Sequence, residues 1–477
     1  MRMARGCAGL ACRAGKRREA DVAAGAETPH RRRGRRPQRP QHMPDLLSYL
    51  ATVLWAAELA ALAYVVYRGA LGVLGLRGRR PLAPGRCETR FLVLLPARNE
   101  ESVIGETVRH LQRLDYPADL RLVFVVADDC SDATASQAAA AGARVLRKPA
   151  PATTKGAVIQ WALAHPEVAA AAWDALVIFD ADSRPAPNFL KAMDAAIAAG
   201  ERAVQSRSES HGQKGWVPTA YAVNTTQRNR TWHQAREMAG FSAALTGTGL
   251  CFTREVLKDL PPDTRTLTED LEYGAKLTLA GIRVRYLHEA VTVIDQPPSL
   301  RASAGQRLRW ARGQLRTALR YAPGLLARAA TRRDLSAFDT ALYLFLPSVV
   351  PFQAFLGLCG LASLLAGGGR PEPMGGLPAV PFLAVAGVLG FSLFLPYLGL
   401  RAERARYAFR DWVAFLLLML TWLPIAAFGA FTMWVEVWNR TPRRRAAGPA
   451  EAAVSDPELL RSAWPEEALT SADRQPR

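Results

Sequence analysis

The longest apolar stretches of the chain lie towards its two ends, outside a central region of mixed character. The first is residues 45–67, in which Glu58 is the one charged side chain after Asp45. Three more follow at residues 341–366, 377–400 and 412–435. Each is long enough to cross the ~30 Å apolar layer of a membrane as a helix. The pattern therefore predicts about four transmembrane helices that flank one soluble region.

Residues 88–300 follow a different pattern, in which short apolar runs alternate with helical patterns. The runs Phe91–Leu95, Leu122–Val126 and Ala175–Phe179 are typical of buried strands, and Val103–Leu114 is typical of a helix. Strands that alternate with helices predict a parallel sheet covered by helices on both faces. We therefore expect an α/β domain whose ligands bind at the carboxyl ends of the strands.

Basic residues predict how the membrane helices are oriented. Four arginines follow the first apolar stretch: Arg68, Arg77, Arg79 and Arg80. The positive-inside rule places that end, and with it the α/β domain, in the cytoplasm of a multi-pass cell-membrane protein. The loop 401–410 and the segment 440–445 are both basic, and three crossings cannot put both in the cytoplasm. The sequence therefore leaves the number of C-terminal membrane helices undetermined by one. The tail, residues 446–477, has the composition of a disordered segment.

Charge and cysteine usage narrow the class of protein. The chain has 477 residues and a formal net charge of +19, and residues 1–42 hold twelve Lys and Arg against three acids. This arm could bind nucleic acid, could be a disordered tail, or could precede a true start at Met43. No aromatic residue lies among its arginines, so a stacking surface for single strands is absent. The disordered tail is the favoured interpretation, and no nucleic-acid partner is expected. Six scattered cysteines exclude a disulfide scaffold and a zinc ribbon.

Acidic residues directly follow two of the predicted strands. Asp128 and Asp129 follow the second run, and Asp180 and Asp182 follow the third. Two carboxylates on either side of one residue at a strand exit can converge on a divalent cation, which prefers oxygen ligands and keeps positions open for phosphate. No Gly-rich phosphate loop or dinucleotide motif follows the first strand, so ordinary NTPases and dehydrogenases are excluded. We therefore expect a metal site at Asp180 and Asp182.

Two further motifs each have a structural and a chemical interpretation. Thr268-Glu269-Asp270 can begin a helix, with the threonine as its cap, or Asp270 can act as a general base. The segment with Arg309 and Trp310 can be an amphipathic helix on anionic headgroups. Alternatively, Arg309 pairs with phosphate and Trp310 walls a sugar site.

Two Gly-containing segments are also ambiguous. Thr246-Gly247-Thr248-Gly249 can admit a ligand close to the backbone, because its residues are small. Lys155, in Lys155-Gly156, can be a cation for phosphate. Both segments can equally be loops without a chemical role.

The order of the motifs is more specific than any one of them. Along the chain they are Pro96-Ala97-Arg98-Asn99-Glu100, Asp128-Asp129, Asp180-x-Asp182, Thr246-Gly247-Thr248-Gly249, Thr268-Glu269-Asp270 and Gln306-x-x-Arg309-Trp310. This series, between apolar helices, resembles the membrane-embedded family 2 glycosyltransferases, the group of cellulose, chitin, hyaluronan and poly-N-acetylglucosamine synthases. The resemblance covers about residues 88–320.

The resemblance implies a fold and an activity, those of an enzyme with a GT-A catalytic domain. It implies inverting transfer of a sugar from a nucleotide sugar, a UDP-sugar first of all, to a glycan acceptor in polysaccharide synthesis. The alternative is transfer of a single sugar to a lipid or a polyprenyl phosphate. Mg²⁺ or Mn²⁺ is the implied cofactor, and membrane lipids and an accessory export subunit are candidate partners.

The resemblance also implies roles for individual residues. The donor nucleotide would contact Ala97, Arg98, Glu100, Asp129, Lys155 and Asp180. The metal would lie at Asp180 and Asp182, and Asp270 would deprotonate the acceptor hydroxyl. The acceptor and the donor sugar would contact Gly247, Thr248, Glu269, Gln306, Arg309 and Trp310. The last three would lie on an interfacial helix over residues 301–325.

Overall fold

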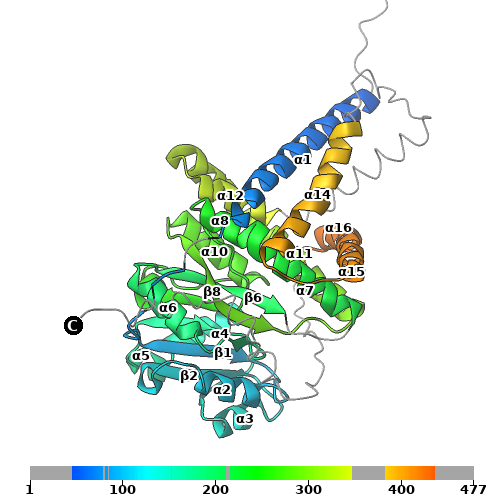
Figure 1. The fold of residues 1–477 in the computed structure, drawn as a ribbon. Coiled ribbons are helices and arrows are strands. Elements are labelled where there is room, and N and C mark those ends of the chain that lie inside the picture. Colours follow the sequence, from blue (N-terminus) through cyan, green and yellow to red (C-terminus); the bar gives the residue numbers. More distant parts are fainter. Residues whose placement is uncertain are drawn as a thin grey trace, which may run out of the picture.

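The computed structural model describes residues 46–78, 81–83, 85–151, 153–210, 215–345 and 382–435. Figure 1 shows an α/β body from which two long helices extend side by side, α1 (Leu46–Leu76) and α14 (Phe382–Ala402). Helix α1 includes residues 46–67 of the first apolar stretch and continues to Leu76; its crossing of a membrane stays a prediction. The predicted segments 1–42 and 446–477, and most of 341–366, lie outside the described residues.

The body is built on an eight-stranded sheet in the order β3-β2-β1-β4-β7-β6-β8-β5. The strands are β1 (Phe91–Ala97), β2 (Arg121–Asp128), β3 (Arg144–Lys148), β4 (Ala175–Ile178), β5 (Arg184–Pro185), β6 (Ala203–Ser210), β7 (Leu250–Thr253) and β8 (Val284–Ile294). The three strands predicted from apolar runs are β1, β2 and β4, and they pair in parallel.

The whole sheet is mixed, which differs from the parallel sheet predicted above. Strand β7 runs antiparallel to both of its neighbours, β4 and β6. Its first residue, Leu250, pairs with Ile178 at the carboxyl end of β4. The chain thus enters β7 from the edge where the parallel strands end, so β7 must run in the opposite direction.

Helices cover both faces of the sheet, as expected. Because side chains alternate along a strand, Phe91, Val93 and Leu95 of β1 pack on one face with residues of α2 and α6. Leu92 and Leu94 pack on the other face with residues of α4 and α10. The helices of the body are α2 (Ile104–Gln112), η1 (Ala118–Leu120), α3 (Thr134–Ala140), α4 (Lys155–Ala164), α5 (Pro166–Ala170), α6 (Phe189–Ala198), α7 (Trp216–Arg228), η2 (Asn229–Gln234), α8 (Ala235–Met238), α9 (Arg254–Asp259), α10 (Glu269–Leu279), α11 (Leu300–Arg332) and α12 (Leu335–Leu344).

The last described segment forms two consecutive helices, α15 (Phe409–Leu420) and α16 (Trp422–Phe431). They meet at Thr421, and Pro424 in the first turn of α16 has no N–H to continue the hydrogen-bond ladder. Helix α15 packs on α7, and α16 packs on α11. Within the described residues, Phe409–Phe431 is the one helical stretch that is long and apolar enough to cross a membrane. The multi-pass arrangement stays a prediction.

Candidate active site

The loops that follow β1 and β2 are joined by hydrogen bonds between the first two motifs. The Asn99 side-chain oxygen accepts from the Ser131 backbone N–H at 2.9 Å, and the Thr134 hydroxyl accepts from the Glu100 N–H at 2.7 Å. Asn99 adopts a left-handed backbone (φ 55°) that permits this turn. The predicted nucleotide residues Ala97, Arg98 and Glu100 therefore lie on one braced loop at the carboxyl edge of the sheet.

The two acids after β2 have different environments. Asp128 is buried, pairs with Lys148 at 2.9 Å and accepts from the Thr153 N–H at 3.1 Å. Asp129 is exposed and has a left-handed backbone, φ 48°. Asp128 thus ties β2 to the segment after β3, and Asp129 is the acid that faces solvent at the site edge. The sequence motif alone does not separate these two roles.

Lys155, the first residue of α4, joins three of the predicted motifs. Its ammonium lies 2.6 Å from an Asp180 carboxylate oxygen and 2.5 Å from the Gly247 carbonyl oxygen. A Glu269 carboxylate oxygen lies 4.0 Å away. Burial alone would lower the pKa of Lys155, but Asp180 and Glu269 together raise it above its usual value. The lysine therefore stays charged between the acidic motifs.

The loop that contains Gly247 is fixed by hydrogen bonds on both sides. The Thr248 hydroxyl accepts from the Asp180 backbone N–H at 3.1 Å. On the other side, the Gln205 side chain accepts from the Thr246 N–H at 2.8 Å and donates to the Thr248 carbonyl at 3.1 Å. Gln205 was not a candidate from the sequence, because a single glutamine in a strand has no motif around it.

The last residue of this loop, Gly249, must be glycine. Its φ of 64° lies in the left-handed region, and a Cβ there would lie 1.9 Å from the Ser206 hydroxyl. The small residues of this motif thus allow the loop backbone to pack closely against β6, and they also leave space in the pocket.

Asp270 lies in the first turn of α10, beside this loop. A Cβ on Gly247 would lie 3.4 Å from the Asp270 Oδ2, so the glycine leaves space directly in front of the carboxylate. Burial, with a further contribution from Glu269, raises the pKa of Asp270 to about 7. Burial also raises the pKa of Glu269, which Lys155 and Arg309 partly oppose. A carboxylate with such a pKa can exchange a proton near neutral pH.

The capping interpretation of this motif is not supported by its threonine. The Thr268 side chain makes no capping hydrogen bond to α10. It faces α11 instead, where a Cβ on Gly313 would lie 2.7 Å from the Thr268 methyl carbon. Close packing against α11 therefore accounts for Thr268.

Helix α11 carries the last motif and divides it between two environments. Arg309 lies near enough to Glu269 to lower its pKa. Trp310 is half-buried and packs against an apolar cluster that includes Tyr221 of α7 and Leu418 of α15. The Gln306 side-chain oxygen is buried without a hydrogen-bond partner among the described residues. Of these three residues, Arg309 is the one whose charge acts on the acidic site, through Glu269.

A pocket lies at this site, and its lining combines a few charged side chains with many apolar ones. Its lining includes Lys155, Gly247, Glu269 and Asp270, whereas its floor is made by apolar residues of α4, β4, β7 and α10. The Asp180 side chain is 41% exposed, so it can accept a ligand.

Comparisons with known proteins agree with this arrangement. Residues 89–313 match the family described as "Glycosyltransferase like family 2". The solved mannosyltransferase PcManGT from Pyrobaculum calidifontis, a complex with GDP-Man and Mn²⁺, superposes with a TM-score of 0.50 at 20% identity, covering 81% of this chain and 99% of its own. The fold is thus that of GT-A-like nucleotide-sugar transferases. Residues 89–313 are thus similar to the catalytic domain of family 2 glycosyltransferases.

Two curated relatives are similar in sequence. The probable glycosyltransferase YdaM of Bacillus subtilis is 26% identical over 274 residues, which are 55% of this chain and 64% of that protein. The chain therefore spans less than two thirds of the length of this relative. The β-monoglucosyldiacylglycerol synthase of Trichormus variabilis is 26% identical over 377 residues, 75% of this chain and 74% of that protein.

Proposed function

We propose that this enzyme transfers one sugar from a nucleotide sugar to a lipid acceptor at a membrane surface, with inversion at the anomeric carbon. The observation that carries the proposal is the exposure of large apolar side chains on α15 and α16, the helices that pack on α7 and α11. Phe409 is 82% exposed and Phe431 is 87% exposed. Apolar patches of this kind mark membrane or lipid contacts. The name of the Trichormus relative, a glucosyldiacylglycerol synthase, supports a lipid acceptor.

The donor would bind along the carboxyl edge of β1, β2 and β4. In this proposal the nucleotide lies on the braced loop with Arg98 and beside the exposed Asp129. The diphosphate would reach Lys155, whose charge is held by Asp180 and Glu269. Arg309 of α11 would pair with a phosphate through its planar fork.

The residues present fit a divalent metal ion that is shared with the donor. Among the described residues, no group of three or more His, Cys, Asp and Glu side chains gathers around one point. Asp180 and Asp182 supply carboxylate oxygens, and Mg²⁺ is commonly held by one or two carboxylates together with substrate phosphates. Such an ion, Mg²⁺ or Mn²⁺, would stabilise the charge that develops on the leaving diphosphate. The PcManGT complex contains Mn²⁺ together with its nucleotide sugar, which supports this choice.

Asp270 would then act as the general base. Its carboxylate accepts the proton of the acceptor hydroxyl while that oxygen forms a bond to the anomeric carbon. The bond from this carbon to the diphosphate oxygen breaks, and the nucleoside diphosphate leaves with the electron pair. Because attack and departure occur on opposite faces, one base is sufficient and the configuration inverts. The space in front of Asp270 that Gly247 leaves open would admit the acceptor.

One assay distinguishes the candidate acceptors. Membranes with the enzyme are supplied with a panel of radiolabelled UDP- and GDP-sugars, Mg²⁺ or Mn²⁺, and diacylglycerol vesicles. A product that extracts into organic solvent and carries one added sugar supports the proposal. A high-mass product sensitive to glycosidase would instead select polysaccharide synthesis, which the series of motifs predicted. Release of nucleoside diphosphate without either product would contradict a lipid acceptor.

A further inference from the structure

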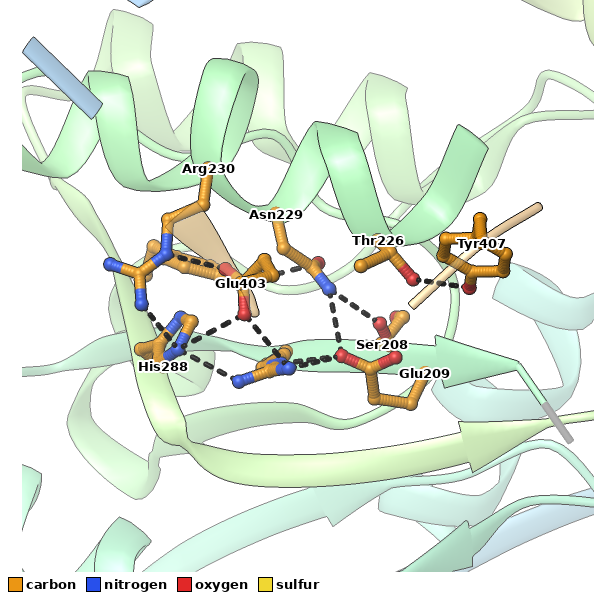
Figure 2. Close-up of polar contacts among 10 residues, drawn as sticks. Ser208, Glu209, Thr226, Asn229, Arg230, His288, Glu403 and Tyr407 are labelled. Carbon is orange, nitrogen blue, oxygen red and sulfur yellow. Dashed lines mark hydrogen bonds and ion pairs between the residues drawn. The ribbon is translucent and has the colours of Figure 1, made fainter. Parts of the chain in front are cut away.

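A buried group of charged side chains joins the end of α14 to the catalytic sheet. We call Arg207, Glu209, Arg230, His288 and Glu403 the Glu403 cluster, and Figure 2 labels the last four of these residues. Glu403 lies 2.5 Å from Arg230 and 3.0 Å from Arg207, and Arg207 also pairs with Glu209 at 2.5 Å. The side chains come from β6, β8, η2 and the turn after α14, so the cluster connects segments that are far apart in sequence.

The charges of this cluster balance. The Glu403 side chain is 2% exposed and that of Arg207 is 5% exposed. Burial, reinforced by Arg207 and Arg230, holds the pKa of His288 well below its usual value, so His288 is neutral at pH 7. Two arginines therefore face two carboxylates. Buried ion pairs contribute little net stability compared with apolar packing, but they disfavour any other arrangement of the segments that they join.

The backbone after α14 is shaped so that Glu403 turns inward. Arg404 has a left-handed φ of 54°, which is uncommon for a residue other than glycine. The Ala405 N–H donates to the Leu400 carbonyl at 3.0 Å and closes a tight turn. Glu403 also lies at the negative end of the α14 dipole, where a carboxylate is disfavoured. Its position there is explained by the two arginines rather than by the helix.

Close packing brings the same turn against α7 and η2. A Cβ on Gly399 would lie 3.0 Å from the Gln227 carbonyl oxygen and 2.7 Å from the Thr231 methyl carbon. The hydroxyls of Thr226 and Tyr407 are 3.1 Å apart. The η2 segment is a π-helix, and such insertions alter the direction of the side chains that they carry. Arg230 is one of these.

The cluster reaches the active site through β6. Arg207 is two residues after Gln205 on this strand, and the pairing of β6 with β8 shifts its register between Ser206 and Arg207. Gln205 forms the two hydrogen bonds that brace Thr246 and Thr248 beside Asp180. A displacement of Arg207 would therefore move β6, the strand that supports the loop at Gly247.

We propose that Glu403 is a positioning residue: by binding Arg207 and Arg230, it sets where the apolar helix α14 meets the catalytic domain, and thereby aligns a membrane-borne acceptor with the loop at Gly247. This inference rests on the lipid acceptor proposed above. It concerns the alignment of two parts of the protein and not the chemistry at Asp270.

The first experiment compares two acceptors in Glu403→Gln. For long-chain diacylglycerol in vesicles, we expect KM to rise about tenfold or more, because misplacement of a substrate by about 1 Å can have such an effect. The KM for a short-chain, water-soluble diacylglycerol and the KM for the donor should not change. Glu403→Asp keeps the charge, so its KM for the vesicle-borne diacylglycerol should return most of the way to the parent value. The matched control is Glu201→Gln, which removes a partly buried ion pair between Glu201 and Arg285 of β8 away from α14.

An equal loss with both acceptors, accompanied by a lower melting temperature, would show a merely structural role and overturn the inference. The second experiment does not depend on the acceptor. Spin labels at Leu393 of α14 and Ala199 after α6, both exposed, report the distance between the two parts. The distribution should be narrow in the parent protein and in Glu201→Gln, and broad or shifted in Glu403→Gln. An unchanged distribution in Glu403→Gln rejects the positioning role, even where the lipid acceptor itself proves wrong.

Discussion

At the scale of single residues, the site is governed by how charges are placed around Lys155. Its ammonium is shared by Asp180, Glu269 and the Gly247 carbonyl, whereas Asp270 receives no direct contact from it. Burial and Glu269 therefore raise the pKa of Asp270, and the hydrogen bond from the Leu271 N–H and the charge of Lys155 offset this only in part. The motif Thr268-Glu269-Asp270 predicted an acid at this position. The pKa of the Asp270 carboxyl is set by its burial and by the charged groups around it.

The first prediction concerns Asp270→Asn. Asparagine keeps the size of the side chain but cannot accept a proton, so turnover should fall by about 100-fold or more. Donor affinity should persist, because Asp270 is not among the proposed nucleotide contacts. In the parent enzyme, kcat/KM should rise as pH increases through about 7, as Asp270 loses its proton. Steady-state kinetics and donor titration on both proteins measure this, and intact turnover in the variant would exclude the base.

The same substitution should alter stability in a direction set by pH. A carboxyl whose pKa is raised in the folded state favours the protonated form, so folding loses stability as pH rises from the ordinary value towards about 7. Asp270→Asn removes this penalty. We expect its melting temperature to exceed that of the parent at pH 8, with a smaller difference at pH 5. A difference that grew towards acid pH would contradict the raised pKa.

The third prediction concerns the metal. Asp182→Asn should increase the Mn²⁺ or Mg²⁺ concentration needed for half-maximal activity by about tenfold or more, since a charged ligand is lost. Membrane insertion should not change. Asp259→Asn, which removes a surface carboxylate paired with Arg202, is the control. Activity that persists in the presence of a chelator would show that no such ion is used.

At the scale of secondary-structure elements, the strands differ in how visible they are in the sequence. The runs behind β1, β2 and β4 are continuous and apolar because these strands are buried on both faces. Strand β6 carries Gln205, Arg207 and Glu209, each of which also has a partner on another element. Polar groups of this kind are buried only because distant segments satisfy them. No local pattern reveals such a strand.

Helix α11 gives the fourth prediction. Its arginines have separate partners: Arg307 donates to the Leu418 carbonyl, Arg312 donates to Thr432, and Arg309 lies near Glu269. Arg309→Lys keeps the charge but loses the planar fork, so we expect KM for the donor to rise about tenfold. Arg312→Lys on the same helix should retain the parent KM. An equal donor KM in the two variants would indicate that Arg309 has a purely structural role in α11.

At the scale of the whole molecule, an α/β catalytic body is joined to apolar helices that present large side chains outward. Leu393, Phe394 and Tyr397 of α14 are exposed, as are Phe409 and Phe431 on the helices that follow. These side chains lie on the helices that pack beside α7 and α11, the latter carrying Arg309. The arrangement brings an apolar surface and the proposed nucleotide-sugar site into one protein.

The fifth prediction tests that surface. The double substitution Phe409→Ser and Phe431→Ser removes two of the most exposed aromatic rings, and both are far from the acidic site in sequence. Binding to lipid vesicles and use of a vesicle-borne acceptor should decrease by about tenfold or more, since each ring buries substantial apolar area. Slow donor hydrolysis in detergent should continue at the parent rate. Unchanged vesicle binding would show that this surface does not contact lipid.

The sequence by itself determined the features that depend on local pattern. These are the central strands, a helix at the first apolar stretch, the acids at strand ends and the order of motifs from Ala97 to Trp310. Local periodicity and strand-end chemistry are properties of a few consecutive residues, so they can be seen without a fold.

Only the tertiary structure decided the direction of β7, the separate environments of Asp128 and Asp129, the support of the loop at Gly247 by Gln205, and the position of Glu403. Each depends on residues that are distant in sequence and close in space. The energy of a buried polar or charged group is set by partners that folding brings to it, so its role is defined only when those partners are in place.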